Sequence, residues 1–363
     1  MLKPGSTIGI LGGGQLGRML ALAAARLGLK CHVFTSEADA CSFQVVPRAT
    51  LAEFTDHAAM ERFAAECDVI TYEFENVPAD AAAFLAARKP VRPDPSVLAT
   101  TQDRIAEKRF VTGLGIGTAP FAAIDGMDDI AAAVAHTGLP AVMKTCRMGY
   151  DGKGQRAVRS LEDAQAAFQA MGEVPCILEG FVPFEREVSV VAARAADGTI
   201  ECFDVTENEH RDHILKISRV PAAVSDEIAD EARAIAGRIA EAFGYIGVLA
   251  VEMFVVADGG RHKVLVNEIA PRVHNSGHWT LDGASVSQFE QHIRAIAGWP
   301  LGKPVRHGRI EMENLIGDEI DRYDAWLRVP GASVQLYGKG AARPGRKMGH
   351  VTRILDSGIE DPT

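Results

Sequence analysis

Two glutamates in the second half of the chain have the residue type and the spacing that suit a divalent cation. Glu252 and Glu268 lie in two β-rich runs joined by Asp258-Gly259-Gly260, a pattern typical of a hairpin. A turn centred on Gly260 would place the two carboxylates opposite each other, where like charges destabilise a sheet by roughly 0.2–1 kcal/mol. Mg²⁺, which binds one or two carboxylates together with substrate phosphates, would relieve that repulsion. Two solvated glutamates at a sheet rim are the alternative.

A glycine-rich loop, residues 149–155, follows a predicted strand that carries Lys144. Its three glycines would let backbone amides close over an anion, and Lys153 adds a second positive charge. A plain surface loop is the alternative, but such loops rarely bring two lysines and three glycines to one strand end. The loop therefore predicts phosphate binding and, with the hairpin glutamates, favours a Mg-nucleotide site.

A second glycine loop, residues 12–17, has the G-x-G-x-x-G pattern between a predicted strand and a predicted helix. Glu37 lies twenty residues beyond Gly17, so the segment fits the dinucleotide fingerprint. The physical content of that pattern is only that amides at a helix N-terminus favour an anion, which a mononucleotide phosphate satisfies as well. NAD is disfavoured because nothing downstream is typical of a hydride-transfer site.

A polar segment, residues 267–278, follows the second strand of the hairpin. His274 and His278 are four residues apart, which invites interpretation as a zinc site. An Asn-Ser-Gly sequence between them breaks any helix, and the glutamate of the zinc-protease motif is absent, so zinc is disfavoured. Arg272, beside a predicted Mg-phosphate site, is better interpreted as a clamp on a small oxyanion.

Two weaker patterns gain meaning from a nearby nucleotide. Exposed backbone at Gly180 could hydrogen-bond an adenine edge, and Glu187 could bind ribose hydroxyls, although glutamates on such strands usually face solvent. Residues 339–347 form a basic, glycine-interrupted turn in an acidic protein. That turn is either a solvated hairpin tip or, if it faces the 12–17 loop, part of the same anion site.

The bulk composition excludes several classes of protein. A formal net charge of −10 argues against general binding to nucleic acid or anionic membranes. The six cysteines are scattered without a C-x-x-C pair, which fits reduced thiols in a cytoplasmic protein. The N-terminus lacks the pattern of a signal peptide, and no stretch approaches the ~18 apolar residues of a membrane span.

The order of predicted elements indicates three domains in 363 residues. Short strands at 7–11, 31–34 and 68–71 alternate with Ala-rich helices, which predicts a doubly wound parallel-sheet domain over residues 1–101. A mixed central domain follows over residues 102–300, with a lid at roughly 118–180. The Gly/Pro-rich passage at 298–304 marks the boundary of a small strand-rich domain over residues 301–363.

These motifs together resemble the ATP-grasp superfamily and, within it, the N5-carboxyaminoimidazole ribonucleotide synthetases of purine biosynthesis. The likeness runs over nearly the whole chain, through the segments 12–17, 71–76, 102–104, 149–155, 179–182, 267–268 and 274–280. The His-Asn-Ser-Gly-His-Trp-Thr run at 274–280 is the most specific of them. Val273 replaces a usual proline, and His213 stands where glycine is expected, but neither is a predicted ligand.

The resemblance implies an ATP-grasp architecture that combines α/β and α+β parts, with ATP between the central domain and the lid. Glu252 and Glu268 would hold Mg²⁺. The residues expected around ATP are Arg104, Lys144, Gly149, Tyr150, Asp151, Gly152, Lys153, Gly154, Gln155, Glu179, Gly180, Phe181, Val182, Glu187, His210, Asn267 and Glu268. Those expected around aminoimidazole ribonucleotide are Gln15, Leu16, Glu73, Glu75, Tyr150, Asn275, Lys339, Arg346 and Lys347, with the phosphate at the last three.

The reaction that the resemblance implies is a carbon–nitrogen ligation in a cytoplasmic homodimer. Bicarbonate attacks the γ-phosphate of ATP to give carboxyphosphate, and the amine of 5-aminoimidazole ribonucleotide then captures the carboxyl group. Arg272, His274 and Lys144 would be the catalytic residues. The implied partners are therefore ATP, bicarbonate and the ribonucleotide, with no nucleic acid and no membrane.

Three other functions remain as alternatives. A formate-dependent glycinamide ribonucleotide transformylase of the same superfamily would carry glutamate at Gln15 and aspartate at Asn275. A Rossmann dehydrogenase would bind NADH. A non-enzymatic nucleotide-binding regulator would have no need of Arg272, His274 or the basic turn.

Overall fold

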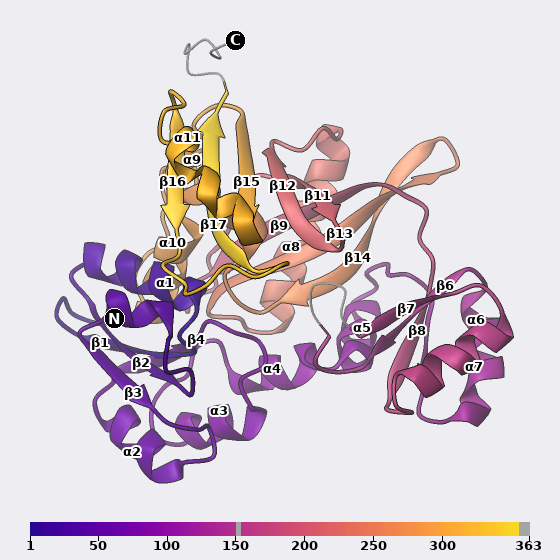
Figure 1. Ribbon diagram of the computed structural model, residues 1–363, viewed down its shortest axis with the longest axis horizontal. Helices are drawn as coiled ribbons and strands as arrows, with labels where there is room; N and C mark the ends of the chain where they lie inside the picture. The colour runs from indigo at the N-terminus through magenta and orange to yellow at the C-terminus, as the bar shows by residue number, and fades with distance from the viewer. Residues whose placement is uncertain (150–153, 356–363) are drawn as a thin grey trace.

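The chain folds around three β-sheets, as the computed structural model shows for residues 1–149 and 154–355 (Figure 1). The first sheet belongs to the N-terminal hundred residues, the second forms a small separate lobe, and the third is a long sheet that reaches into the C-terminal strands. Predicted site residues from these regions contact one another, as in the Arg104–Glu268 and Arg272–Glu75 ion pairs.

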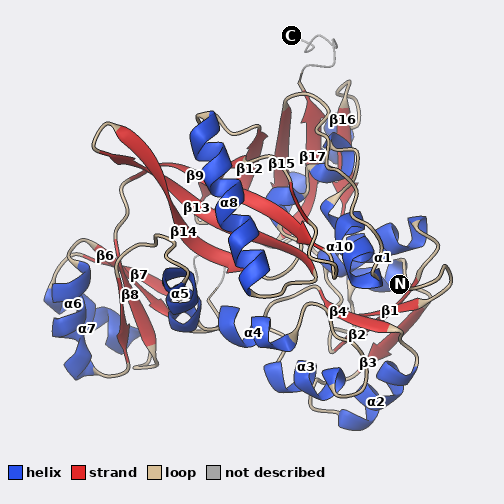
Figure 2. Ribbon diagram, turned by 180° about the vertical axis from the view of Figure 1, so that it is seen from behind, coloured by secondary structure: helices blue, strands red, loops and turns tan. Residues whose placement is uncertain are grey.

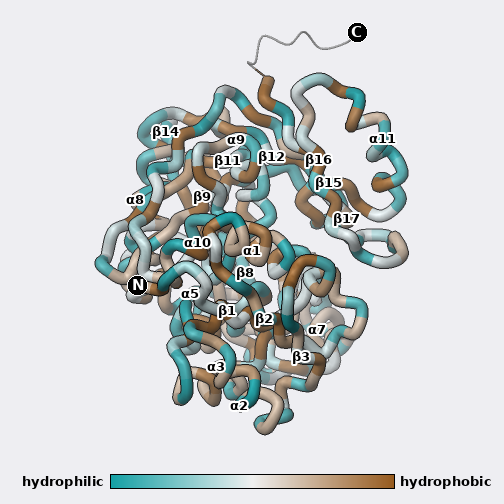
Figure 3. The backbone as a smooth tube through the Cα atoms, turned by 90° about the vertical axis from the view of Figure 1, so that its left-hand side faces the viewer, coloured by the Kyte–Doolittle hydropathy of each residue, from teal (hydrophilic) through white to brown (hydrophobic). Residues whose placement is uncertain are grey.

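The N-terminal sheet is parallel, with strand order β3-β2-β1-β4. Its elements are β1 (Thr7–Leu11), α1 (Gln15–Arg26), β2 (Lys30–Thr35), η1 (Cys41–Gln44), β3 (Arg48–Leu51), α2 (His57–Ala65), β4 (Val69–Tyr72) and α3 (Ala79–Ala86). One apolar cluster packs α1 on one face, and a second packs α2 and α3 on the other. The apolar runs of β1 and β2 are visible in Figure 3. The doubly wound fold is confirmed, although β3, which is short and mostly exposed, is missed by the sequence pattern.

The small lobe is an antiparallel sheet with strand order β5-β8-β6-β7 (Figure 2). Its elements are β5 (Phe121–Ile124), η2 (Met127–Asp129), α6 (Ile130–Thr137), β6 (Ala141–Thr145), β7 (Gln155–Val158), α7 (Leu161–Ala170) and β8 (Cys176–Gly180). Helices α4 (Pro95–Thr101) and α5 (Arg104–Gly113) connect it to the N-terminal sheet. Both helices begin at an aspartate N-cap whose carboxylate accepts backbone N–H groups, which fixes where each helix starts.

The long sheet has the strand order β14-β13-β9-β11-β12-β15-β17-β16, with β10 paired to β9. Its strands are β9 (Phe184–Arg194), β10 (Ile200–Cys202), β11 (Thr206–Arg211), β12 (Ile214–Val220), β13 (Gly247–Asp258), β14 (Arg261–Ala270), β15 (Ile310–Ile316), β16 (Ala332–Leu336) and β17 (Lys347–Ile354). Its helices are α8 (Asp226–Ala242), η3 (Asn275–Gly277), α9 (Thr280–Gly283), α10 (Gln288–Ala297), η4 (Gly317–Arg322) and α11 (Tyr323–Trp326).

The C-terminal strands are not a detached appendage, because β15 pairs with β12 and continues the long sheet. The strand content expected after residue 301 is present, but the hydrogen-bonded sheet runs through that boundary. The core is also shared, since α10 packs against α1 in one apolar cluster with Leu20, Phe289 and Ile293. None of the described helices combines the length and apolar character that a membrane-spanning helix requires.

Candidate active site

The two hairpin glutamates do lie opposite each other, through a β-bulge. The turn pairs Asp258 with Arg261, and this register continues to Met253 opposite Val266. The register then shifts, so that Glu252 pairs with Glu268 and Asn267 is the extra residue between them. Without the bulge, Glu252 would face Asn267. The predicted opposition is confirmed, and the bulge rather than a turn centred on Gly260 is its cause.

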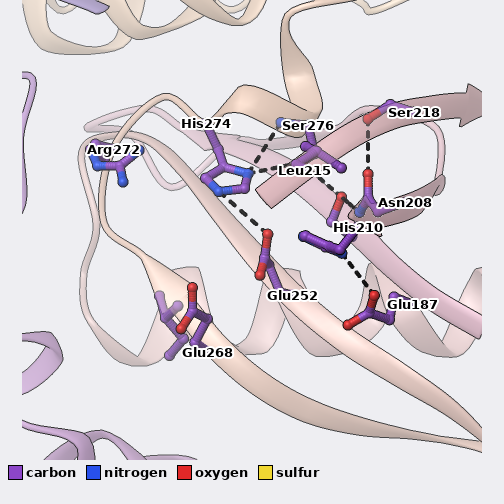
Figure 4. A network of polar contacts seen from close by, with 12 residues as sticks. Glu187, Asn208, His210, Leu215, Ser218, Glu252, Glu268, Arg272, His274 and Ser276 are labelled. Atoms are coloured by element: carbon purple, nitrogen blue, oxygen red, sulfur yellow. Dashed lines mark hydrogen bonds and ion pairs between the residues drawn. The ribbon is translucent and has the colours of Figure 1, made fainter. Parts of the chain in front are cut away.

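This glutamate pair is chemically suited to a cation. Burial, and next the charge of Glu268, raise the pKa of Glu252 to about 7. Arg104 Nη1 lies 3.3 Å from Glu268 Oε2. His274 Nε2 lies 3.4 Å from Glu252 Oε1 (Figure 4). Within residues 1–149 and 154–355, no group of three or more His, Cys, Asp or Glu side chains could hold a metal. Two carboxylates side by side suit a cation that takes its remaining ligands from phosphate oxygens.

His274 is anchored from both its backbone and its ring. Gln288 accepts the His274 backbone N–H at 2.9 Å and donates to its carbonyl at 2.7 Å. Nδ1 of the His274 ring contacts Ser276 Oγ at 2.9 Å, and the His274 side chain caps η3. Burial, and next the charges of Arg272 and Lys347, lower the pKa of His274 to about 3. His278, the other member of the considered zinc pair, instead has its Nδ1 3.1 Å from Gln288 Nε2.

The guanidinium fork of Arg272 holds a carboxylate of the chain itself. Its Nε and Nη2 donate to the two oxygens of Glu75, and Nη1 donates to the Val273 carbonyl. Burial raises the pKa of Glu75, but Arg272 outweighs this and lowers it to about 2. Two predicted site residues therefore pair with each other, and the contact of Arg272 with an oxyanion and that of Glu75 with a substrate amine stay predictions.

The 12–17 glycine loop also receives its anion from the chain. The Gly14 and Gly17 amides donate to Glu73 at 2.5 and 2.8 Å, at the N-terminus of α1. Gly12 has a φ of 104°, and a Cβ there would lie 2.6 Å from Glu73. In the ligand-free chain the Glu73 carboxyl group takes these amides, and binding of a substrate phosphate at this loop stays a prediction. Leu16 is 8% exposed and packs into the core, so only its main chain is available to a ligand.

Lys144 and Glu179 form an ion pair at the base of the small lobe. Glu179 is also 3.0 Å from Lys108 Nζ, whose ammonium donates to the Asn267 carbonyl at 2.7 Å. Burial raises the pKa of Glu179, but the two lysines outweigh it and lower the pKa to about 2. Lys108 was missed by sequence reasoning because a single lysine on a helix has no local signature of burial. It connects the lobe carrying Lys144 to the hairpin carrying Asn267.

Gly180 does not offer an exposed backbone edge. Its N–H donates to the Pro120 carbonyl at 2.8 Å, and β8 has a hydrogen-bonded neighbour on both sides. A Cβ at this position would lie 2.7 Å from the Thr137 carbonyl oxygen. The exposed backbone expected at Gly180 is therefore not found, because its N–H is used within the small lobe, and a contact of this residue with adenine stays a prediction. Phe181, next in sequence, is 56% exposed.

The remaining residues predicted to bind the nucleotide include Glu187 on β9, His210 on β11 and the 149–155 loop. His210 and Glu187, on neighbouring strands, are hydrogen-bonded at 2.7 Å. Burial lowers the pKa of His210, but the hydrogen bond that His210 donates to the Glu187 carboxylate, with the charges of Glu252 and Glu187, outweighs burial and raises the pKa. Gly149 accepts a 3.5 Å hydrogen bond from Arg104. Tyr150, Asp151, Gly152 and Lys153 lie outside the described residues.

His213 lies in a turn where the resemblance predicts glycine. Its φ is 63°, in the left-handed region that favours glycine, so the turn keeps the geometry that a glycine would adopt. Its Nδ1 is 3.4 Å from Nε2 of Gln155, at the end of the phosphate-binding loop candidate.

The basic turn faces the N-terminal domain, as one of the two alternatives predicted. Gln44 Nε2 donates to the Gly338 carbonyl at 2.7 Å. Lys339 Nζ donates to the Lys347 carbonyl at 2.8 Å, and burial is the main cause that lowers its pKa to about 8. Ser42, in the adjoining η1, is fully buried, and its Oγ has no partner among the described residues. Sequence reasoning missed Ser42 because no motif marks it.

Two more substrate candidates have different surroundings. Arg346 donates from Nη1 to the Ala341 carbonyl at 3.1 Å, within the basic turn. Asn275 is 9% exposed, and neither polar atom of its amide has a partner among the described residues. A buried amide without partners is costly, so Asn275 is a strong candidate for contact with a ligand.

Removing the Lys108 charge is expected to destabilise the fold. Lys108→Met leaves the buried Glu179 with one cationic partner, which should lower the free energy of unfolding by about 3–5 kcal/mol. The exposed pair of Lys263 and Asp258 supplies the control, because Lys263→Met should change it by less than about 1 kcal/mol. Urea unfolding of both variants measures the difference. Equal, small losses would show that Lys108 is not needed to neutralise Glu179.

Comparisons with known proteins find similarity along most of the chain. Residues 109–289 match the ATP-grasp domain, residues 5–102 the ribonucleotide synthetase preATP-grasp domain, and residues 311–360 the phosphoribosylaminoimidazole carboxylase C-terminal domain. The N5-carboxyaminoimidazole ribonucleotide synthase of Brucella melitensis biotype 1 is 52% identical over 97% of both chains.

Solved structures show the same likeness in three dimensions. The N5-carboxyaminoimidazole ribonucleotide synthetase of Thermus thermophilus is 46% identical, with a TM-score of 0.90 over 96% of this chain and 94% of that one. The N5-carboxyaminoimidazole synthase of Aspergillus clavatus, in complex with ADP and 5-aminoimidazole ribonucleotide, is 31% identical. Its TM-score is 0.88 over 97% of this chain and 94% of that one.

Proposed function

The chain belongs to the N5-carboxyaminoimidazole ribonucleotide synthases of the ATP-grasp superfamily, and from this membership we propose how its site works. It is an ATP-dependent carbon–nitrogen ligase that carboxylates the amine of 5-aminoimidazole ribonucleotide in purine biosynthesis. The single observation that carries the proposal is the Glu252–Glu268 pair, set beside His274 and between the lysines of the small lobe and the basic turn. Two opposed carboxylates, with Arg104 beside Glu268 and His274 beside Glu252, suit Mg-ATP.

ATP occupies the region between the small lobe and the long sheet. Lys144 approaches the phosphates, Glu187 and His210 the ribose, and the 149–155 loop covers the phosphates. Glu252 and Glu268 would hold Mg²⁺, which would supply positive charge to the phosphoryl oxygens. Binding requires Lys144 to exchange part of its ion pair with Glu179 for the phosphates.

Bicarbonate and the ribonucleotide occupy the side facing the N-terminal domain. Arg272 binds bicarbonate, and Glu75 fixes the orientation of the Arg272 guanidinium. Bicarbonate and the Glu75 carboxylate therefore both accept hydrogen bonds from the same guanidinium. Lys339, Arg346 and Lys347 bind the ribonucleotide phosphate, with Ser42 as a fourth donor from η1. Asn275 supplies an amide to the substrate, and Gln15 and Glu73 border its amine end.

The decisive test of the function is ADP release. We expect ADP formation that depends on both bicarbonate and 5-aminoimidazole ribonucleotide, with no ADP formed when formate and glycinamide ribonucleotide replace them. ADP formation with the second pair would favour the transformylase alternative. Tight NADH binding that substrate displaces would restore the dehydrogenase.

The phosphate contact has an expected pH dependence. Lys339 attracts the ribonucleotide phosphate only while protonated, and its pKa is lowered to about 8. The KM for the ribonucleotide should therefore rise as the pH passes about 8, whereas the KM for ATP should not. Lys339→Arg keeps the charge at every pH tested and should remove the rise. A rise of equal size in that variant would assign the titration to another group.

The proposal also includes three domains, with limits at 1–101, 102–300 and 301–363. It further includes a homodimer and a cytoplasmic location. The pairing of β12 with β15 supports treating the last two domains as one rigid unit. Light scattering of the purified protein measures the oligomeric state directly.

A further inference from the structure

A buried chain of hydroxyl and amide groups runs across the long sheet from β12 to His274 (Figure 4). Ser218 Oγ donates to Asn208 Oδ1 at 2.9 Å, and Asn208 Nδ2 donates to Ser189 Oγ at 2.9 Å. Ser189 Oγ then contacts Ser276 Oγ at 2.8 Å, which contacts His274 Nδ1 at 2.9 Å. All four residues before His274 are buried, with exposures of 0% for the three serines and 7% for Asn208.

The direction of this chain follows from counting protons. Each serine hydroxyl has one proton to donate. Ser189 accepts from the Asn208 amide and donates to Ser276, which is the arrangement that gives its own buried proton a partner. Ser276 must then give its only proton to His274 Nδ1, which therefore accepts.

The opposite direction conflicts with a backbone contact. Reversal would turn the Asn208 amide over and require His274 Nδ1 to donate to Ser276 Oγ. The Ser276 backbone N–H, however, points at the same Nδ1 from 3.3 Å. If His274 Nδ1 were protonated, its N–H and the Ser276 backbone N–H would point at each other. The backbone therefore favours the direction in which Ser276 donates to Nδ1, whichever way the oxygen and nitrogen of the Asn208 amide are assigned.

We propose that this chain holds His274 as the neutral tautomer with its proton on Nε2. His274 then presents an N–H donor toward Glu252, whose Oε1 is 3.4 Å from Nε2, and toward the oxygens of bound substrates. Neither ring nitrogen is a free acceptor, because Nδ1 takes the Ser276 proton and Nε2 carries its own. His274 therefore stabilises negative oxygens by donation and does not take a proton from the amine.

Ser276, Ser189 and Asn208 are accordingly positioning residues for the reaction. Ser189 and Asn208 act on His274 through Ser276, and Ser189 also pairs with Glu252 across β9 and β13. The 274–280 motif by itself points only to Ser276. Ser189 is 87 residues from Ser276 in sequence, and Asn208 joins from another strand. The assignment rests on the proposed function only for its kinetic consequence, since the proton position is a property of the ligand-free protein.

The first test measures that proton position without any reaction. Protein labelled with ¹⁵N-histidine, free of ligands, is examined by NMR, and the His274 ring signals are assigned by their loss in His274→Gln. We expect a protonated Nε2 and an unprotonated Nδ1. A protonated Nδ1 would overturn the proposal, and would do so even if the ligase activity were fully confirmed.

The second test breaks the chain at a distance. Ser189→Ala removes the donor to Ser276, so a population protonated on Nδ1 should appear, and kcat should fall roughly tenfold with the KM for ATP unchanged. Ser189→Thr keeps the hydroxyl and should restore both readouts. Thr352→Val is the matched control, because Thr352 carries a buried hydroxyl in the same sheet that has no partner among the described residues. If Ser189→Ala keeps a single tautomer and a normal kcat, or behaves like Thr352→Val, the chain does not position His274.

Discussion

Glu252→Ala and Glu268→Ala should each reduce ADP formation on the order of a thousandfold, the scale seen when an oriented stabilising group is lost from a transition state. The two carboxylates are paired across β13 and β14, so removal of either leaves half of the proposed Mg²⁺ site. Asp258→Ala, at the exposed tip of the same hairpin, is the control and should keep normal activity. Near-normal ADP formation in both glutamate variants would remove the metal assignment.

Thermal stability provides a readout of the same site that does not require turnover. A ligand at 100 times its Kd stabilises a protein by roughly 2.7 kcal/mol, so saturating Mg-ATP should raise the Tm of the parent. The shift should be largely lost in Glu268→Ala. An unchanged shift in that variant would show that Mg-ATP binds without the glutamate pair.

The pH dependence of the ligand-free protein has a defined sign. The pKa of Glu252 rises to about 7 in the folded state, against about 4.3 for an unperturbed glutamate. Folding therefore favours the protonated form, and its contribution to stability is present below about pH 4 and is lost as the pH rises toward 7. Glu252→Gln should flatten this decline in urea unfolding, and a parallel decline in both proteins would exclude Glu252 as its source.

Local sequence patterns predict this site well where the chemistry lies within one hairpin or one loop. The β-rich runs of β13 and β14 and the glycines of the turn between them predict a hairpin. That hairpin places Glu252 opposite Glu268 to within one residue of the observed register. The final residue of register comes from the bulge at Asn267. Bulges depend on how neighbouring strands pack, and here β9 pairs with β13 on the other side, so a single hairpin pattern could not have indicated it.

Contacts between distant segments are what the sequence could not supply. The glycine pattern at 12–17 predicts an anion at α1, but Glu73, about sixty residues away, provides it. A composition-based boundary at residue 301 likewise hides the pairing of β15 with β12, because register depends on hydrogen bonds rather than on glycine and proline content. In each case, tertiary packing decides which of several locally reasonable partners is chosen.

Arg272 and Glu75 are the most consequential of these distant pairs. They lie 197 residues apart, and both are largely buried, with side-chain exposures of 16% and 31%. Glu75 is itself fixed, because Gln102 Nε2 donates to its carbonyl at 2.8 Å and to that of Val77 at 2.7 Å. The carboxylate therefore presents the guanidinium to the site in one orientation.

Arg272→Lys is expected to lower kcat about a hundredfold while leaving ATP affinity nearly unchanged. Lysine keeps the positive charge, but a single ammonium cannot contact both Glu75 oxygens and still direct donors at bicarbonate. Arg306→Lys, in a partly exposed pair with Asp204, is the matched control and should leave turnover normal. The measurement is bicarbonate-dependent ADP release together with ATP affinity. Normal turnover, or loss of ATP binding alone, would show that bicarbonate is held elsewhere and that Arg272 serves mainly to neutralise Glu75.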